Sequence, residues 1–258
     1  MSKLAVLVLF LVTYGTALAT QSLADQGMHH AGSVRIVGGK VVPAKKYPFM
    51  AFLRSDRKFL CGGTILNNLW ILTAAQCTFR KPYYKIEVVV GTTNMRSGGI
   101  INRVAGVYKH PKFNNTGYLV NDVAMLLLET PLKFSATVAP VILNAAVLYV
   151  VDVTVLGWGY TTDEGPTSNE LRELSTKTIS HMDCRQYRGY EEKLNEDQIC
   201  TKLQRGKRIG KADFGGPLIE TKSKMQVGIA SLSTYFSPDT FVRISSYIDW
   251  IKKTGELP

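Results

Sequence analysis

The N-terminal region of the sequence has no apolar run long enough to cross a bilayer. The run from Leu4 to Val12 is too short for a spanning helix. Lys3 precedes this run and the small-residue site at residues 17–19 follows it, an arrangement typical of a secretory signal peptide. The alternative is a buried N-terminal strand. We therefore expect a signal peptide at residues 1–19 and a secreted mature protein without a membrane anchor.

Cysteine is scarce, with four residues in 258. In a chain with a signal peptide, four cysteines imply disulfides. Local pairing of Cys61 with Cys77 and of Cys184 with Cys200 would close two loops, each worth about 3 kcal/mol on the loop-entropy model. Metal ligation is the alternative, but neither pair has the internal spacing of a zinc site and no histidine cluster accompanies them. We expect no metal and no cofactor.

Acidic residues are outnumbered, with 20 Asp and Glu against 31 Lys and Arg, and the net charge is +11. The basic residues lie in short clusters, without the basic helix or repeated aromatic pattern of a nucleic-acid binder, so no nucleic-acid partner is expected. Such clusters commonly form a solvated surface; the alternative is a patch that steers an acidic protein or glycan partner. The clusters include Arg80-Lys81, Arg205–Arg208 and Lys222/Lys224.

Short β-rich runs alternate with Gly, Pro, Asn and Ser over most of the chain, which predicts a β-sandwich or barrel. The runs are Met50–Leu53, Gly63–Leu66, Ile86–Val90, Ala124–Leu128, Val151–Leu156 and Met225–Ala230. The segment 245–253 differs, because Tyr247, Ile248, Trp250 and Ile251 can share one face of a helix that Ser245 would cap. We expect a short C-terminal helix packed on the β-structure.

Several ordered motifs resemble those of trypsin-like serine proteases. Residues 35–39 (Arg-Ile-Val-Gly-Gly) resemble the family's activation junction, and the likeness continues to the C-terminus through Cys61–Leu66, Trp70–Cys77, Asn121–Leu126, Gly157–Gly159 and Asp213–Leu218. The resemblance implies an all-β fold of two packed six-stranded antiparallel β-barrels with a C-terminal α-helix. It also implies a propeptide at residues 20–35, cleavage between Arg35 and Ile36, and a peptidase-like domain at 36–258.

The chemistry of that family needs a serine nucleophile, a histidine base and an aspartate that orients the histidine. In the matching motifs Gln76 stands in place of the histidine and Phe214 in place of the serine, whereas the aspartate is retained as Asp122. A glutamine amide does not accept and return a proton near neutral pH, and a phenyl ring offers no nucleophilic atom. The resemblance therefore predicts a pseudoprotease without catalytic residues.

Further differences from the family affect the rest of the expected active site. Ala212 replaces a glycine whose N–H helps to bind the developing oxyanion, and its Cβ is expected to disturb that loop. Arg208 or Ile209 occupies the base of the specificity pocket, where a trypsin-like enzyme has an aspartate. His110 and His181, the histidines outside the propeptide, are expected to be structural or solvated, so no alternative triad is expected.

The resemblance also implies a function without catalysis. The sequence is most similar to the scabies mite inactivated serine-protease paralogues, a group found in the mite gut and faeces that inhibits host complement by binding its components. The resemblance implies a secreted, monomeric scaffold whose partners are host proteins, bound through surface loops. The candidate contacts are Arg205–Arg208, Lys222–Lys224 and Thr234–Ser237, and Asn114 is a candidate for glycosylation. The alternative is a cofactor or decoy in a protease cascade such as melanisation, although the clip domain usual in that group is absent from residues 20–35.

Ile36 and Asp213 are both present, so cleavage after Arg35 could bury a new ammonium group against the Asp213 carboxylate. A buried pair of this kind specifies a conformation more than it adds stability. We therefore expect the cleaved and uncleaved forms to differ in the order of their loops; the alternative is an inherited propeptide that is never cut. Limited proteolysis of the two forms tests this, and equal protease sensitivity would exclude it.

Overall fold

The computed structural model of the chain describes residues 39–115, 119–159, 167–187, 194–204, 208–234 and 236–257. The predicted signal peptide at 1–19, the predicted propeptide at 20–35 and the Arg35–Ile36 junction lie outside these residues. Within the described part of the chain, no helix is both long and apolar enough to span a membrane.

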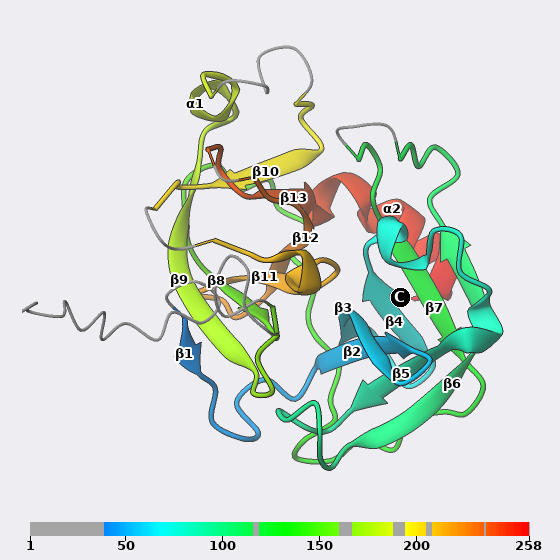
Figure 1. Cartoon of the computed structure of the whole chain (residues 1–258). Helices are drawn as coiled ribbons and strands as arrows, with labels where there is room; N and C mark the ends of the chain where they lie inside the picture. The colour runs from blue at the N-terminus through cyan, green and yellow to red at the C-terminus, as the bar shows by residue number, and fades with distance from the viewer. Residues whose placement is uncertain are drawn as a thin grey trace, which may run out of the picture. The chain divides into compact units, whose positions relative to one another are not determined.

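The first β-barrel is closed and antiparallel, with the strand order β2-β3-β4-β7-β6-β5 (Figure 1). Its strands are β2 (Met50–Ser55), β3 (Lys58–Ile65), β4 (Trp70–Thr73), β5 (Ile86–Val90), β6 (Ile100–Lys109) and β7 (Ala124–Leu128). The pairing of β2 with β5 closes the barrel. Its interior is apolar: Leu53, Ile71, Val88 and Leu126 are fully buried.

The second barrel contains six further antiparallel strands in the order β9-β10-β13-β12-β11-β8, and the pairing of β8 with β9 closes it. The strands are β8 (Asp152–Gly157), β9 (Arg172–Ile179), β10 (Gln198–Thr201), β11 (Pro217–Glu220), β12 (Gln226–Leu232) and β13 (Thr240–Arg243). A two-residue strand, β1 (Lys40–Val41), adds to the outside of β9. The predicted pair of six-stranded antiparallel barrels is therefore confirmed.

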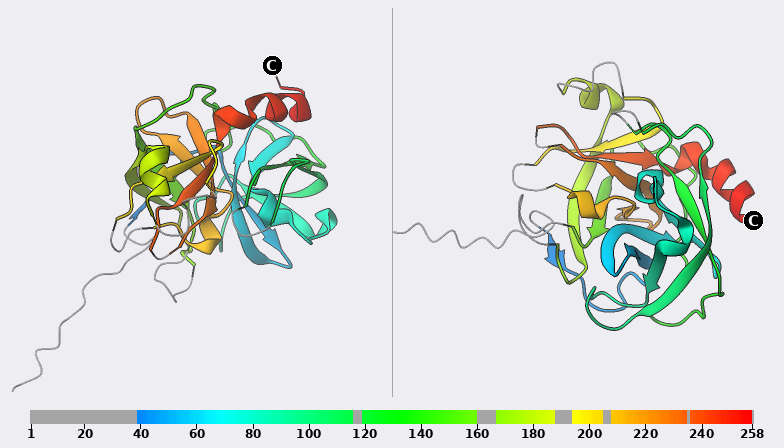
Figure 2. Two further views of the ribbon diagram at one scale, coloured as in Figure 1. Left: turned by 90° about the horizontal axis from the view of Figure 1, so that it is seen from above. Right: turned by 45° about the vertical axis from the view of Figure 1, so that its right-hand side comes forward.

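The helices are short except for the last one. They are the 3₁₀ turns η1 (Ala75–Thr78), η2 (Tyr83–Lys85) and η3 (Lys211–Asp213) and the α-helices α1 (His181–Arg185) and α2 (Ile244–Gly255). Helix α2 is the predicted C-terminal helix; it buries Tyr247 and Ile251 and packs against both β12 and β7 (Figure 2). Its N-cap is Arg243, without a side-chain capping bond, so the prediction that Ser245 caps the helix is wrong. Ser245 lies in the first turn instead.

Two disulfides fix short elements to strands. The Cys61–Cys77 bond joins β3 to η1, and the Cys184–Cys200 bond joins α1 to β10. These are the two local pairs that the sequence analysis expects. Because η1 carries Gln76, the first disulfide also restrains the backbone next to one of the candidate site residues.

The two barrels approach each other through backbone at three glycines. The Gly62 N–H, on β3, donates to the Phe214 carbonyl at 2.9 Å. A Cβ on Gly62 would lie 2.9 Å from the Gly216 Cα, and Gly215 has a φ of 80°, which strongly favours glycine. This contact therefore positions the segment that carries Phe214 directly against the first barrel.

We predict that Gly62→Ala destabilises the fold by about 1–3 kcal/mol, because the added methyl meets rigid backbone and the barrels must separate. Denaturant unfolding, monitored through tryptophan fluorescence, measures the free energy of unfolding. Gly106→Ala is the control, since its Cβ would meet only the ring of the exposed Tyr108, at 3.1 Å. Equal stability of wild type and Gly62→Ala would contradict the proposed close approach.

Candidate functional site

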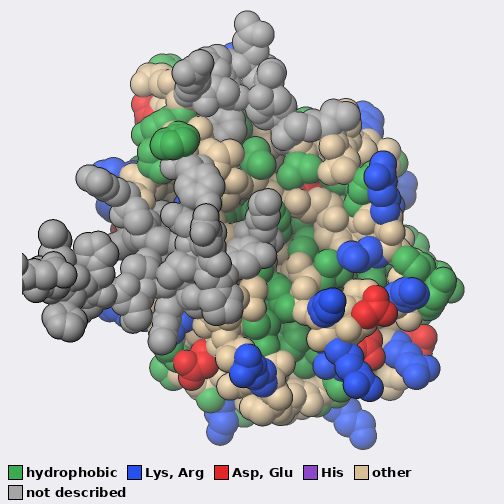
Figure 3. All heavy atoms as spheres, viewed as in Figure 1, with side chains coloured by type: hydrophobic (Ala, Val, Ile, Leu, Met, Phe, Trp, Pro, Cys, Tyr) green, Lys and Arg blue, Asp and Glu red, His purple; other side chains and the backbone are tan. Residues whose placement is uncertain are grey.

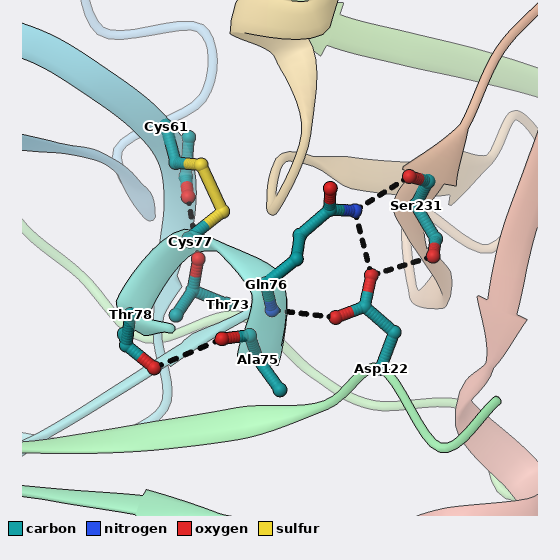
Figure 4. The surroundings of a disulfide bond; sticks show 9 residues. Cys61, Thr73, Ala75, Gln76, Cys77, Thr78, Asp122 and Ser231 are labelled. Atoms are coloured by element: carbon teal, nitrogen blue, oxygen red, sulfur yellow. Dashed lines mark hydrogen bonds between the residues drawn. A yellow bond between two sulfur atoms is a disulfide. The ribbon is translucent and has the colours of Figure 1, made fainter. Parts of the chain in front are cut away.

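A fully buried carboxylate, that of Asp122, is the centre of the candidate site. Its Oδ1 accepts a hydrogen bond from the Gln76 backbone N–H at 2.7 Å. Its Oδ2 accepts from the Gln76 side-chain amide at 2.7 Å and from the Ser231 hydroxyl at 2.6 Å. Figure 4 shows these three residues converging from η1, the segment before β7, and β12. The site therefore joins the two barrels.

The electrostatics of Asp122 combine two opposing effects. Burial raises the pKa of its carboxyl group to about 6, because a charge in a low-dielectric interior is disfavoured. The hydrogen bonds from Ser231 and Gln76 act in the opposite direction, since they stabilise the ionised form. At pH 8 the group is therefore an ionised carboxylate that is held by polar donors.

The Gln76 side chain uses its whole amino group in this network. Its Nε2 donates to Asp122 and also to the Ser231 carbonyl oxygen, at 2.6 Å. Two acceptors fix the orientation of the amide, because the opposite orientation would place Oε1 against two oxygens. The amide thus binds and orients its neighbours, but it does not take up a proton near neutral pH.

Phe214 follows η3 directly and lies at the junction of the barrels. Its side chain is half-buried and packs against the apolar cores of both barrels. Its carbonyl is held by Gly62, whose neighbour Cys61 is linked through the disulfide to Cys77, next to Gln76. A phenyl side chain at this position contributes packing and offers no nucleophilic or proton-transferring atom.

Asp213, immediately before Phe214, is a second fully buried carboxylate. It accepts hydrogen bonds from the backbone N–H groups of Gly159, at 2.6 Å, and Gly210, at 2.8 Å. Burial raises its pKa to about 7, while these two bonds lower it and the negative charge of Asp239 raises it. Ile36, its predicted partner after cleavage, lies outside the described residues.

Ala212 lies in η3, between Gly210 and Asp213, and is buried. The turn is closed by the Asp213 N–H, which donates to the Gly210 carbonyl at 2.8 Å. A 3₁₀ backbone is open to any L-residue, so the Cβ of Ala212 is accommodated in a hydrogen-bonded turn.

A third buried carboxylate, Asp239, was not singled out from the sequence. Its two oxygens accept from the Ser233 hydroxyl at 2.6 Å and from the Ile209 N–H at 2.9 Å. Burial raises its pKa to about 6, and the positive charge of Arg208 lowers it. The side chain of Ile209 is fully buried, whereas that of Arg208 is half-exposed. Residues 208–209, expected at the base of the specificity pocket, thus bring the Arg208 guanidinium close enough to the Asp239 carboxylate to lower the pKa of that group.

Neither histidine side chain in the described part of the chain is hydrogen-bonded to Asp122, Gln76 or Ser231. The His110 ring packs edge-on against Tyr247 and Trp250, each with its centroid at 5.3 Å, and burial lowers its pKa. The His181 Nδ1 lies 3.3 Å from a Glu196 carboxylate oxygen. In the described ranges, no group of three or more His, Cys, Asp or Glu side chains could hold a metal ion.

The predicted surface residues are partly visible. Lys222 and Lys224 are exposed in the turn between β11 and β12, and Phe236 is 89% exposed. Arg205–Lys207 and Tyr235 lie outside the described residues, and so does Thr116 of the glycosylation sequon. Asn114 itself is exposed, as an acceptor for a glycan must be. Its glycosylation stays a prediction.

Comparisons with known proteins agree with the architecture. A family model described as Trypsin matches residues 36–251. Serine protease SP24D of Anopheles gambiae is 32% identical, over 85% of this chain and 81% of that protein, and human granzyme M is 28% identical, over 98% and 96%. The solved structure of mouse neuropsin, described as a serine protease expressed in the limbic system of the brain, superimposes with a TM-score of 0.77. It is 27% identical, and the match covers 84% of this chain and 99% of that one.

We predict that Gln76→Glu costs about 2–4 kcal/mol of stability at pH 8, because it removes two donors and places a second carboxylate beside Asp122. The penalty should shrink at pH 5, where the two carboxyl groups share a proton that the native state binds more tightly than the unfolded chain. Urea unfolding at both pH values measures it.

The control is Gln76→Met, which removes the same donors without adding a charge, so its penalty should vary less with pH. If Gln76→Glu and the wild type had the same free energy of unfolding at pH 8, that result would contradict the hydrogen-bond network around Asp122.

Proposed function

The chain belongs to the trypsin family, and we propose that within this family it is a secreted pseudoprotease that acts by binding a protein partner. The observation that carries the proposal is the state of residue 76. Where a catalytic base must accept a proton, Gln76 presents an amide whose two N–H groups are already donated to Asp122 and to Ser231. Asp122 still orients the side chain at position 76 through hydrogen bonds, but that side chain is an amide and not a base.

Residue 214 supports the same proposal. The family's mechanism needs a hydroxyl there, and Phe214 supplies a ring packed on both cores. In another serine protease, removing the nucleophile alone lowers kcat by about 10⁶-fold. Loss of the base in addition leaves no group at position 76 that could take a proton from a nucleophile.

The specificity segment also supports a loss of catalysis. A trypsin-like pocket presents a free carboxylate to the Lys or Arg of its substrate. Here the Asp239 carboxylate accepts hydrogen bonds from Ser233 and Ile209, and the positive charge of Arg208 stabilises its ionised form. A basic substrate side chain would compete with a cation that is already present. This arrangement disfavours the substrates of trypsin-like enzymes.

A rigid two-barrel scaffold with variable surface loops is suited to recognition. The motifs that resemble the scabies mite inactivated paralogues suggest host complement components as partners. We propose that the secreted protein, after removal of residues 1–35, occupies such a component and inhibits it by obstruction, without turnover.

A serum haemolysis assay tests this function. Increasing amounts of the purified mature chain should lower complement-dependent lysis, and mass spectrometry of the serum should find the complement proteins uncut. The reduced and unfolded chain is the control, because it has the same composition and charge without the surface. Undiminished lysis at micromolar protein would refute complement inhibition, and cut complement components would refute a non-catalytic mode of action.

A further inference from the structure

Two cations share one aromatic ring on the surface of the first barrel. Phe79 follows η1, and its ring packs edge-on against Phe113 at 6.1 Å. The Arg80 guanidinium carbon lies 5.1 Å from the Phe79 centroid and the Lys109 Nζ lies 5.9 Å from it. Cations at these distances are attracted to the face of a ring. The Phe79 ring therefore holds together cations from two segments that are distant in sequence.

More cations surround this pair. We define the basic face as the exposed side chains Arg80, Lys81, Tyr84, Lys85, Lys109 and Lys112. Residues 79–85 and 106–113, which supply them, contain no Asp or Glu. None of the ion pairs among the described residues includes a cation of the basic face. Figure 3 shows several Lys and Arg side chains over the first barrel, with Asp and Glu side chains between some of them.

Aromatic exposure accompanies the charge. Tyr84 is 70% exposed and Tyr83 48%, and their rings contact each other at 5.8 Å. They belong to η2, which lies against β6, the strand that ends at Lys109. An exposed tyrosine ring gains no stabilisation from apolar burial until a partner covers it. Tyrosine and arginine are enriched in protein interfaces, where the aromatic ring supplies contact area and the cation supplies pairing.

We propose that the basic face is a docking surface for an acidic segment of a protein partner. The inference rests on the proposed binding function and names the surface and the chemistry of the partner. Arg80 can pair with a carboxylate through two hydrogen bonds, and the lysines attract further acidic residues. The exposed tyrosines favour a peptide over a sulfated glycan, because a peptide also offers apolar side chains to the rings.

The basic face lies on the first barrel and begins just after Gln76 of the candidate site in the sequence. The Phe79 N–H donates to the Gln76 carbonyl at 3.2 Å, so the basic face begins one turn after the candidate site. Among the described surface candidates predicted from the sequence, Arg208 lies between β10 and β11, and Lys222 and Lys224 lie between β11 and β12, all strands of the second barrel. The proposed docking surface is therefore a different part of the molecule.

Fluorescence anisotropy with the mature chain and a short labelled peptide of alternating Glu and Tyr tests the proposal. Arg80→Glu/Lys109→Glu should weaken binding at least about tenfold, and Tyr84→Ala at least about threefold. Lys222→Glu/Lys224→Glu makes the same change in net charge on the second barrel, so it should stay within about twofold of wild type. If the Arg80→Glu/Lys109→Glu variant does not fold, Arg80→Gln/Lys109→Gln takes its place. This variant removes the two charges without reversing them and should also weaken binding.

Three outcomes would overturn the proposal: no binding, equal losses in the two charge-reversed variants, or tighter binding of a heparin fragment with no effect of Tyr84→Ala. Mass spectrometry of the peptide distinguishes a missing docking surface from a catalytically active chain. A peptide that stays intact and unbound refutes the docking surface alone, whereas a peptide that is cut refutes the proposed function.

Discussion

The hydrogen bonding of the buried Asp122 carboxylate is the interaction on which the rest of the site depends. A charge buried to this degree is costly unless donors satisfy it, and here the donors come from both barrels: Gln76 from the first and Ser231 from the second. The carboxylate therefore fixes the position of η1 relative to β12. A side chain at position 76 that donates toward Asp122 is therefore more stable there than one that cannot donate.

Glutamine meets this structural requirement without meeting the chemical one. Its Nε2 reaches Asp122 and leaves Oε1 as a poor proton acceptor. The same separation applies at position 214, where the backbone carbonyl still receives the Gly62 N–H although the side chain has become hydrocarbon. The backbone framework is therefore compatible with an amide at position 76 and a phenyl ring at position 214, and the proposed binding function uses the surface instead.

Sequence motifs predicted the parts of the structure that are encoded locally. The run at Ile86–Val90 coincides with β5, because strongly apolar β-branched residues mark a buried strand. Strand β9 was missed because its sequence is mostly polar. Arg172 is nevertheless buried there, since it donates to the Gly39 carbonyl and to Ser168.

The contacts between distant segments could not be predicted in the same way. Asp239 is an isolated acidic residue in the sequence, and only folding brings it to Ser233 and Ile209. The basic face likewise depends on Lys109 reaching the ring of Phe79 from another strand. The pairing of Gln76 with Asp122 was predictable, because each residue lies in a motif of the trypsin family.

The most direct test of the central claim is a measurement of turnover on the chain cut after Arg35, the form in which an active relative would work. The chain is incubated with a diverse peptide library and, separately, with a serine-directed fluorophosphonate probe; an active trypsin-family protease is the positive control. The account predicts no new peptide fragments and no labelled protein. Fragments that increase with time, or covalent labelling of the folded chain, would contradict it.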